Sequence, residues 1–170
     1  LDGDVDRAHP AAVPYEPRWP LWSNGSDKVR HLVLPEGGGV DDSTEPWTFP
    51  VGTLLFKTFR YAVDGELRPF ETRLLRLAPG GWEYGSWQWD EAGTDATRLD
   101  MLLPALVSAP GPDGQPFEHE IPNRLQCRKC HESGATAVLG YNALQLPADE
   151  ATPLHADPLT AEVLGYFVGN

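Results

Sequence analysis

The sequence predicts a mainly β fold, a single antiparallel β-sheet domain with short peripheral helices. Glycine and proline number seventeen each among 170 residues, accompanied by six Trp, five Tyr and six Phe. Glycine and proline favour tight turns, and aromatic residues are enriched in strands. Several segments also alternate polar and apolar side chains with the period of two that is typical of strands. A chain of this length is sufficient for one domain with its own core.

Three parts are expected along the chain. Residues 1–20 form an irregular Pro-rich arm, residues 21–147 form the β domain, and residues 148–170 form a C-terminal tail with a short helix. The arm contains four prolines and shows no period. Because proline cannot donate a hydrogen bond to a β-ladder, this arm is either irregular or an edge segment of the sheet.

The first strands are expected at residues 28–34 and 51–61. Residues 28–34 alternate polar and apolar side chains, and residues 51–61 are rich in aromatic residues and threonine. Both patterns are typical of strands, and the second is the clearest in the chain.

A β-hairpin is expected next. Its arms are residues 71–77 and 82–89, which flank the turn sequence Pro79-Gly80-Gly81. Trp82 and Tyr84 share one face of the second arm and Trp87 and Trp89 share the other, and this change of phase at Gly85-Ser86 predicts a β-bulge there.

The sequence of the last third of the chain predicts less regular structure. Residues 99–107 are apolar and fit either a strand or a short helix, although Pro104 argues against a continuous helix. Residues 135–146 are expected to hold a short helix. Asp157-Pro158 before residues 159–167 predicts a capped terminal helix, with Asp at the N-cap and Pro at the first helical position.

The charge of the chain excludes some classes of function. The formal net charge is −12, and the acidic residues are spread along the sequence. Nucleic acid is not an expected partner, because no Lys/Arg stripe is present to contact phosphates. The acidic surface suits a basic redox partner protein, although most acidic surfaces are merely solvated. No run of about eighteen apolar residues occurs, so no membrane span is expected.

The motif Cys127-Arg128-Lys129-Cys130-His131 contains the two cysteines of the chain. Its spacing allows two thiols to reach the two vinyl groups of one haem, while the adjacent histidine ligates the iron. We therefore expect one covalently attached haem c, held by Cys127 and Cys130, with His131 as an axial ligand. Haem attached in this way matures outside the cytoplasm, which predicts a periplasmic or other extracytoplasmic bacterial protein. Its export would require a signal peptide that precedes Leu1.

Three other interpretations of the cysteines stay open. A structural disulfide between Cys127 and Cys130 is possible but strained, because only two residues separate them. A zinc site needs four nitrogen or sulfur ligands, and the chain has no second cysteine pair. A thioredoxin-like dithiol expects a βαβ context, which the sequence does not predict. A haem-free dithiol domain or a zinc-stabilised binding domain is therefore the weakest alternative.

The second axial position of the iron has three candidate ligands. Met101 is the one methionine of the chain, and its thioether would give a six-coordinate iron suited to electron transfer. A single methionine in an apolar segment is more often core filling. His31 and His119 could also ligate iron or move protons, although each is more often a surface or hydrogen-bonded histidine.

Two cationic residues are candidates for contacts with the cofactor. Lys57 lies on the strand face shared by Leu55 and Phe59, so it is either a distal-pocket or haem-bonding lysine, or a lysine whose stem packs on the sheet. Arg73 is a candidate both for a charge-assisted hydrogen bond to a haem propionate and, equally, for an ordinary cross-strand ion pair.

Three segments together resemble the cytochrome P-460 and cytochrome c′-beta family. They are residues 49–57, Phe-Pro-Val-Gly-Thr-Leu-Leu-Phe-Lys, then Gly81-Trp82-Glu83-Tyr84, then the late Cys-x-x-Cys-His motif. The resemblance implies a mostly β haem protein with its attachment motif after the sheet. It also places Lys57 at the position of the family's haem-cross-linking lysine. The cross-linked branch oxidises hydroxylamine or nitric oxide, and the c′-beta branch binds gases.

A longer stretch, residues 14–147, is similar to a group of bacterial haem-binding proteins without an assigned activity. The similarity rests on motifs such as residues 20–25, Pro-Leu-Trp-Ser-Asn-Gly, then Glu71-Thr72-Arg73 and Val138-Leu139-Gly140. It implies the P-460-like fold and a haem, and it leaves the activity open.

The function we expect first is that of a monohaem c-type cytochrome in periplasmic electron transfer or haem-based redox sensing. The alternative is a P-460-type enzyme or gas-binding protein for hydroxylamine or nitric oxide, with an open distal site and Lys57 as the candidate catalytic residue. A redox protein and a second copy of the chain are the partners we consider.

Overall fold

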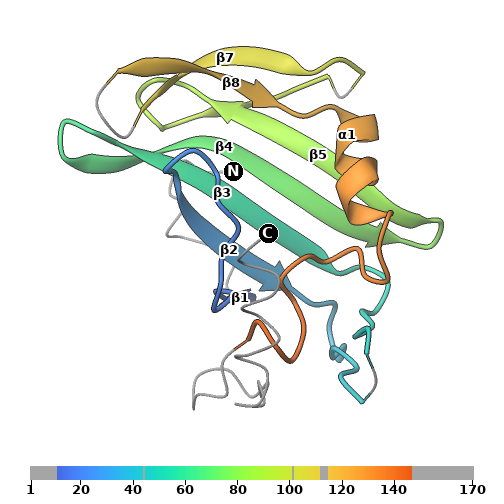
Figure 1. Cartoon of the computed structure of the whole chain (residues 1–170). Coiled ribbons are helices and arrows are strands. Elements are labelled where there is room, and N and C mark those ends of the chain that lie inside the picture. Colours follow the sequence, from blue (N-terminus) through green and yellow to red (C-terminus); the bar gives the residue numbers. More distant parts are fainter. Residues whose placement is uncertain (1–10, 44, 101, 112–114, 147–170) are drawn as a thin grey trace.

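A computed structural model describes residues 11–43, 45–100, 102–111 and 115–146. Over these residues the chain forms a six-stranded sheet, a separate two-stranded ribbon and one helix (Figure 1). The elements in chain order are β1 (Ala12–Pro14), β2 (Asp27–Val33), β3 (Leu54–Val63), β4 (Glu66–Ala78), β5 (Gly81–Trp89), β6 (Ala96–Arg98), β7 (Ala105–Pro110), β8 (Pro116–Ile121) and α1 (Arg124–His131). The prediction of a mainly β, antiparallel fold is confirmed.

The six-stranded sheet is a meander, because its strands lie side by side in sequence order and every neighbouring pair is antiparallel. Asp64 and Gly65 connect β3 to β4, and both have positive φ (53° and 84°), as a tight two-residue hairpin requires. The predicted hairpin is confirmed and is longer than expected, since β4 begins at Glu66. The expected strand at residues 28–34 is also confirmed, as β2.

The inner face of the sheet is the face that carries the cross-strand row Leu32, Leu55, Leu75 and Tyr84. The segment that follows α1 packs on it. Val138, Tyr141 and Leu146 of that segment form the core cluster together with Leu32, Trp47 and Leu55. This apolar contact holds the C-terminal part of the described chain against β2 and β3.

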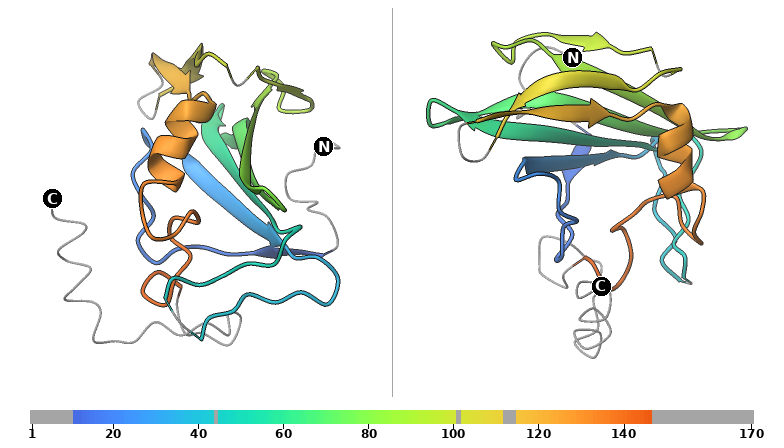
Figure 2. Two further views of the ribbon diagram at one scale, coloured as in Figure 1. Left: turned by 90° about the vertical axis from the view of Figure 1, so that its right-hand side faces the viewer. Right: turned by 45° about the horizontal axis from the view of Figure 1, so that its top comes forward.

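The ribbon of β7 and β8 crosses over the sheet, and α1 continues from the end of β8 on the same side (Figure 2). Ile121, the last residue of β8, is 1 % exposed and anchors this junction. Phe117 of β8 contacts Tyr61 of β3 edge to face, with ring centroids 5.9 Å apart. The inner face is therefore bordered by β8, α1 and the segment after α1.

The predicted bulge at Gly85-Ser86 is wrong. The pairing of β4 with β5 runs without a shift from Glu71 opposite Gln88 to Ala78 opposite Gly81. The aromatic residues of β5 alternate regularly, so those at even positions simply face the other way from Trp87 and Trp89. The register shift lies instead between Phe59 and Arg60 of β3.

The short helix expected at residues 135–146 is also wrong, because this segment forms turns. Gly140 has a φ of +79°, which is outside the helical region. The side-chain oxygen of Asn142 accepts hydrogen bonds from the backbone N–H groups of Leu144 and Gln145, and this asparagine turn replaces a helical turn. The expected terminal helix at residues 159–167 lies outside the described residues.

Two open expectations are decided by the structure. The N-terminal arm contains an edge strand, since β1 pairs with β2. The ambiguous stretch at residues 99–107 leads into a strand, because β7 begins directly after Pro104. The helix found in the described ranges, α1, has eight residues, and no helix there has the length and apolarity of a membrane span.

Candidate functional site

Helix α1 presents the two cysteines of the motif. Its N-cap, Asn123, accepts a hydrogen bond from the backbone N–H of Gln126 (2.9 Å), and the side chain of Gln126 accepts one from the backbone N–H of Asn123 (2.8 Å). This reciprocal capping fixes the start of the helix. Cys127 and Cys130 are then three residues apart on one side of α1, and both are free thiols.

His131 is the last residue of α1, and a hydrogen bond fixes its tautomer. Its Nδ1 lies 2.6 Å from the backbone carbonyl oxygen of Ala137. Because a carbonyl only accepts, Nδ1 carries the proton and donates it, which leaves the lone pair on Nε2. Histidine ligands of metals are commonly oriented by such a bond from the other ring nitrogen.

The surroundings of His131 favour its neutral form. Burial lowers the pKa of this imidazole below its ordinary value, and the charges of Lys57 and Arg73 lower it further. The ring of Tyr84, on the inner face, lies 5.7 Å from the ring of His131. A neutral imidazole with a free Nε2 is the form that binds a metal ion.

Lys57 and Arg73 lie side by side on the inner face, directly opposite each other on β3 and β4. Both stand over the ring of Phe59, with Lys57 Nζ 4.8 Å and Arg73 Cζ 4.6 Å from its centroid. Their charges act on His131, and the charge of Arg73 also acts on the pKa of Cys127. The fold thus brings four sequence-predicted residues to one place: Lys57, Arg73, Cys127 and His131.

The pKa of Lys57 falls from 10.5 to about 7. Burial is the largest cause, and the positive charges of Arg30, Arg73 and Lys28 act in the same direction. An amine with this pKa is partly uncharged at neutral pH, so Lys57 can act there as a base or a nucleophile.

Glu71 and His119 form a buried pair that the sequence reasoning missed. Glu71 is fully buried, and its carboxylate bonds both to Arg73 of its own strand and to His119 of β8, with His119 Nε2 at 2.9 Å. Burial alone would raise the pKa of Glu71, but the hydrogen bonds from His119 and Arg73 lower it below its ordinary value. The sequence signal was the Glu71-Thr72-Arg73 cluster, in which the carboxylate precedes the arginine by two residues on one strand face.

The structure places the two histidine candidates for a second axial ligand differently, His31 on the far face of the sheet and His119 against Glu71 of the inner face. His31 lies on the face of β2 opposite to Arg30 and Leu32, and therefore on the far side of the sheet. His119 is 7 % exposed, and its Nε2 is held by Glu71. Met101, the third candidate, lies outside the described residues.

The zinc and dithiol interpretations gain no support from the described part of the chain. No group of three or more His, Cys, Asp or Glu side chains in these ranges could hold a metal ion. Every strand pair described there is antiparallel, so the βαβ context of a thioredoxin-like dithiol is missing from it.

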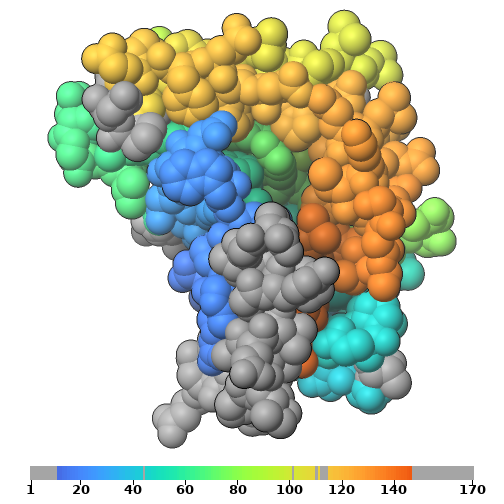
Figure 3. All heavy atoms as spheres, in the orientation of Figure 1, coloured from blue at the N-terminus to red at the C-terminus, as the bar shows by residue number. Residues whose placement is uncertain are grey.

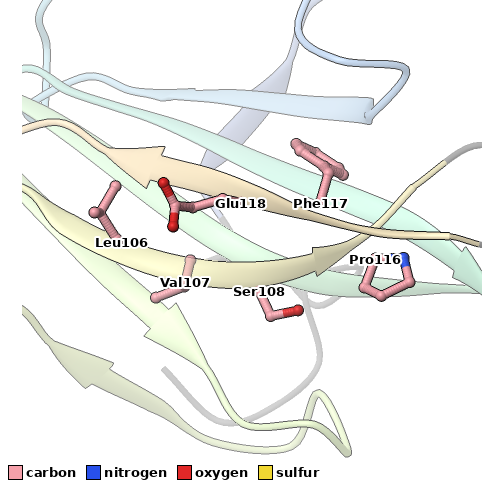
Figure 4. Close-up of a pocket in the computed structure, with 6 residues that line it drawn as sticks. All are labelled: Leu106, Val107, Ser108, Pro116, Phe117 and Glu118. Atoms are coloured by element: carbon pink, nitrogen blue, oxygen red, sulfur yellow. The ribbon is translucent and has the colours of Figure 1, made fainter.

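The inner face is recessed between the N-terminal segment and α1, below β8 (Figure 3). A different, open pocket of about 340 Å³ lies on the β7–β8 ribbon (Figure 4). Its lining residues come from these two strands, and they are Leu106, Val107, Ser108, Pro116, Phe117 and Glu118. None of the sequence-predicted site residues lines this pocket, so the recess beside α1 is the candidate functional site.

Comparisons of the chain with models of protein families, with curated proteins and with solved structures give no match. The resemblance to the cytochrome P-460 and c′-beta family therefore stays a prediction from the sequence motifs. The function must be argued from the geometry of the candidate site.

Proposed function

We propose that this chain is a monohaem c-type cytochrome of the bacterial extracytoplasmic space. Cys127 and Cys130 would hold the haem covalently, and His131 would ligate its iron through Nε2. The observation that carries the proposal is the hydrogen bond from His131 Nδ1 to the carbonyl oxygen of Ala137. It orients a neutral imidazole at the end of the helix that presents both thiols.

The residues around the motif fit such a group. Tyr84 and Phe59 offer aromatic surface on the inner face, and Arg73 and Lys57 offer positive charge for the carboxylates of a haem. A bound haem supplies one-electron redox chemistry and, with an open coordination position, the binding of small gases. The protein would supply the proximal ligand, the apolar wall and the counter-charges.

The role that the geometry supports best is the binding of a small ligand at an open iron face. His31 lies on the far face of the sheet, and the Nε2 of His119 is bonded to Glu71, so neither of these two nitrogen sources favours a second axial ligand over an open position. Lys57, with a pKa near 7, stands on the same inner face and can donate or accept a proton at its Nζ near a bound ligand. This is the gas-binding or P-460-type alternative.

Electron transfer or redox sensing is the second candidate role. Cys130 is exposed, whereas Cys127 is half-buried. A thioether bond at Cys130 would leave one edge of the haem close to the surface, where electrons can pass to a redox partner protein.

An absorption spectrum of the ferric and ferrous protein, combined with the mass of the intact chain, tests the proposal. We expect the mass of one covalent haem and a ferrous spectrum that changes when carbon monoxide is added. A chain without a haem adduct would overturn the proposed function. A low-spin spectrum that ignores carbon monoxide would select electron transfer over ligand binding.

The state of Lys57 requires its own measurement. Peptide mass spectrometry of the haem-loaded protein shows whether the peptide that contains Lys57 carries an extra bond to the haem. An unmodified Lys57 peptide would remove the cross-link and leave Lys57 as a free amine beside the site.

A further inference from the structure

Three cationic side chains form one row across the inner face of the sheet. Arg30 of β2 is paired with Lys57 of β3, and Lys57 is paired with Arg73 of β4. Like charges directly opposite each other on neighbouring strands are destabilising. The row, which we call the cation row, is unusual in a chain whose formal net charge is −12.

Among the described residues, Arg73 has a counter-charge in contact with it, and the other two members of the cation row do not. Glu71 bonds to Arg73 through two guanidinium nitrogens. In the described part of the chain, neither Arg30 nor Lys57 forms a side-chain hydrogen bond or an ion pair. Glu16 and Asp27 act on Arg30 only from a distance, and Asp27 is itself paired with Arg60 at 2.7 Å.

Arg30 gives the second, independent observation. Arg30 is 7 % exposed, and its side-chain Nη1 is buried without a hydrogen-bond partner. A buried donor on a charged group is costly when it is left unpaired. A guanidinium presents its donors as a rigid fork that matches a carboxylate or another oxyanion.

We propose that the cation row is a binding site for an oxyanion group, held by the guanidinium of Arg30 and the amine of Lys57. The group is a carboxylate or a small free oxyanion such as phosphate. A haem propionate is one source, and this source rests on the proposed function. A free oxyanion is the other source, and it would bind whether or not the chain carries a haem.

The test uses the full-length protein as purified and inorganic phosphate as the probe, at constant ionic strength. The side-chain Nε–H signal of Arg30 is followed by NMR in the ferrous, carbon-monoxide-bound state if haem is present. Arg30→Gln removes the guanidinium that is proposed to bind the oxyanion. Arg60→Gln is the matched control, because it removes a cation of the same sheet that already has Asp27 as its partner.

A free oxyanion site predicts a saturable shift of the Arg30 signal with phosphate. Arg60→Gln should keep that response, and Lys57→Gln should weaken the apparent affinity by about tenfold, the loss of one close charge pair. The Lys57 variant keeps the test decisive if the Arg30 variant does not fold.

A propionate source predicts no phosphate response in the wild type, because the site is already filled. Arg30→Gln should then raise the pKa of that propionate, so that the reduction potential becomes pH-dependent between about pH 5 and 7, whereas Arg60→Gln should not. The proposal is overturned if phosphate moves no Arg30 signal and Arg30→Gln matches Arg60→Gln in reduction potential. Absence of haem with a phosphate response would overturn the proposed function alone.

Discussion

At the scale of single residues, the orientation of His131 carries the proposal of an iron centre. Its Nε2 is free because its Nδ1 donates to a backbone oxygen six residues further along the chain. That acceptor, Ala137, belongs to a segment held by the core residues Val138 and Tyr141. The orientation of the imidazole is therefore maintained by packing on the inner face rather than by α1 alone.

Replacing His131 should change the iron environment without detaching a covalent haem. In His131→Ala, Cys127 and Cys130 still hold the cofactor covalently. Because the iron then lacks its histidine ligand, we expect the absorption bands of the haem to shift. His31→Ala is the control, since His31 lies on the other face of the sheet. Equal spectra for wild type and His131→Ala would contradict the assigned ligand.

Removing the carboxylate of Glu71 should destabilise the fold strongly. Glu71→Gln leaves Arg73 and His119 without their buried counter-charge, and breaking a buried pair in this way costs about 3 kcal/mol. Urea unfolding measures the loss. The matched control is Glu83→Gln, whose partner Arg76 is exposed and 3.9 Å away, and there we expect less than about 1 kcal/mol.

The same carboxylate predicts how stability depends on pH. Burial opposes ionisation of Glu71, but the bonds from His119 and Arg73 lower its pKa below the ordinary 4.5. A carboxyl group whose pKa is lower in the folded state than in the unfolded state stabilises the fold. This stabilisation is complete above the pKa of the unfolded state and is lost as the pH falls through the pKa of the folded state. The gap in unfolding free energy between wild type and Glu71→Gln should therefore narrow below about pH 4.5. A gap that widens on acidification would contradict the assignment.

At the scale of elements, α1 depends on its first turn. The helix has eight residues and none of them is buried, so it has little packing of its own. A helix this short is marginal without tertiary contacts or caps. The reciprocal bonds between Asn123 and Gln126 and the anchor at Ile121 therefore determine where the cysteines are presented.

Removing the N-cap should weaken both the helix and haem attachment. Asn123→Ala should lower the free energy of unfolding by about 1 kcal/mol, the usual value of such a cap. It should also reduce the fraction of chains that carry haem, measured by intact mass. Lys129→Ala, in the same helix and outside the cap, is the control. Unchanged haem loading in Asn123→Ala would show that the motif does not need a preformed helix.

The sequence predicted the sheet better than the segments around it. β2 and the β4–β5 hairpin follow from alternation and from turn residues, which act locally. The helix α1 was not predicted, although Asn123-x-x-Gln126 is the signature of a capping box, because its eight residues include none that is buried and so show no apolar helical period. The helix expected at residues 135–146 is absent because the packing of Tyr141 and the side chain of Asn142 outweigh helix propensity.

The candidate site was predictable in part. The motif residues and Lys57 follow from spacing and from the position of a charge on an apolar strand face. The pairing of Glu71 with His119 and the alignment of Arg30 with Lys57 and Arg73 depend on the register between strands. Register is set by the whole sheet and the ribbon above it, so no local pattern could have revealed these contacts.

At the scale of the whole molecule, the protein combines a negative surface with a positive recess. The net charge of −12 sets the long-range field, while the cation row sets the field beside α1. The rate at which a small redox reagent exchanges electrons at the surface should therefore depend on the charge of the reagent.

Oxidation and reduction by a cationic metal complex should be about tenfold faster than by an anionic complex at low ionic strength. The difference should vanish near 1 M salt, where the screening length is about 3 Å. Stopped-flow mixing of the haem-loaded protein with each reagent measures both rates. A faster anionic reagent would place electron exchange in the positive recess instead.

The meander order of the sheet makes its strand contacts local in the sequence. Each strand from β1 to β6 pairs with its neighbour in sequence, and the ribbon of β7 and β8 closes locally. Such short-range contacts form quickly, so the sheet can be complete while the cysteine motif is still an open end of the chain. The segment with Val138 and Leu146 follows the motif in the chain, covers the inner face and supplies the oxygen that orients His131. Packing of this segment on the inner face would then complete the orientation of His131, and a defect in it would leave a folded sheet whose His131 lacks the bond to Ala137.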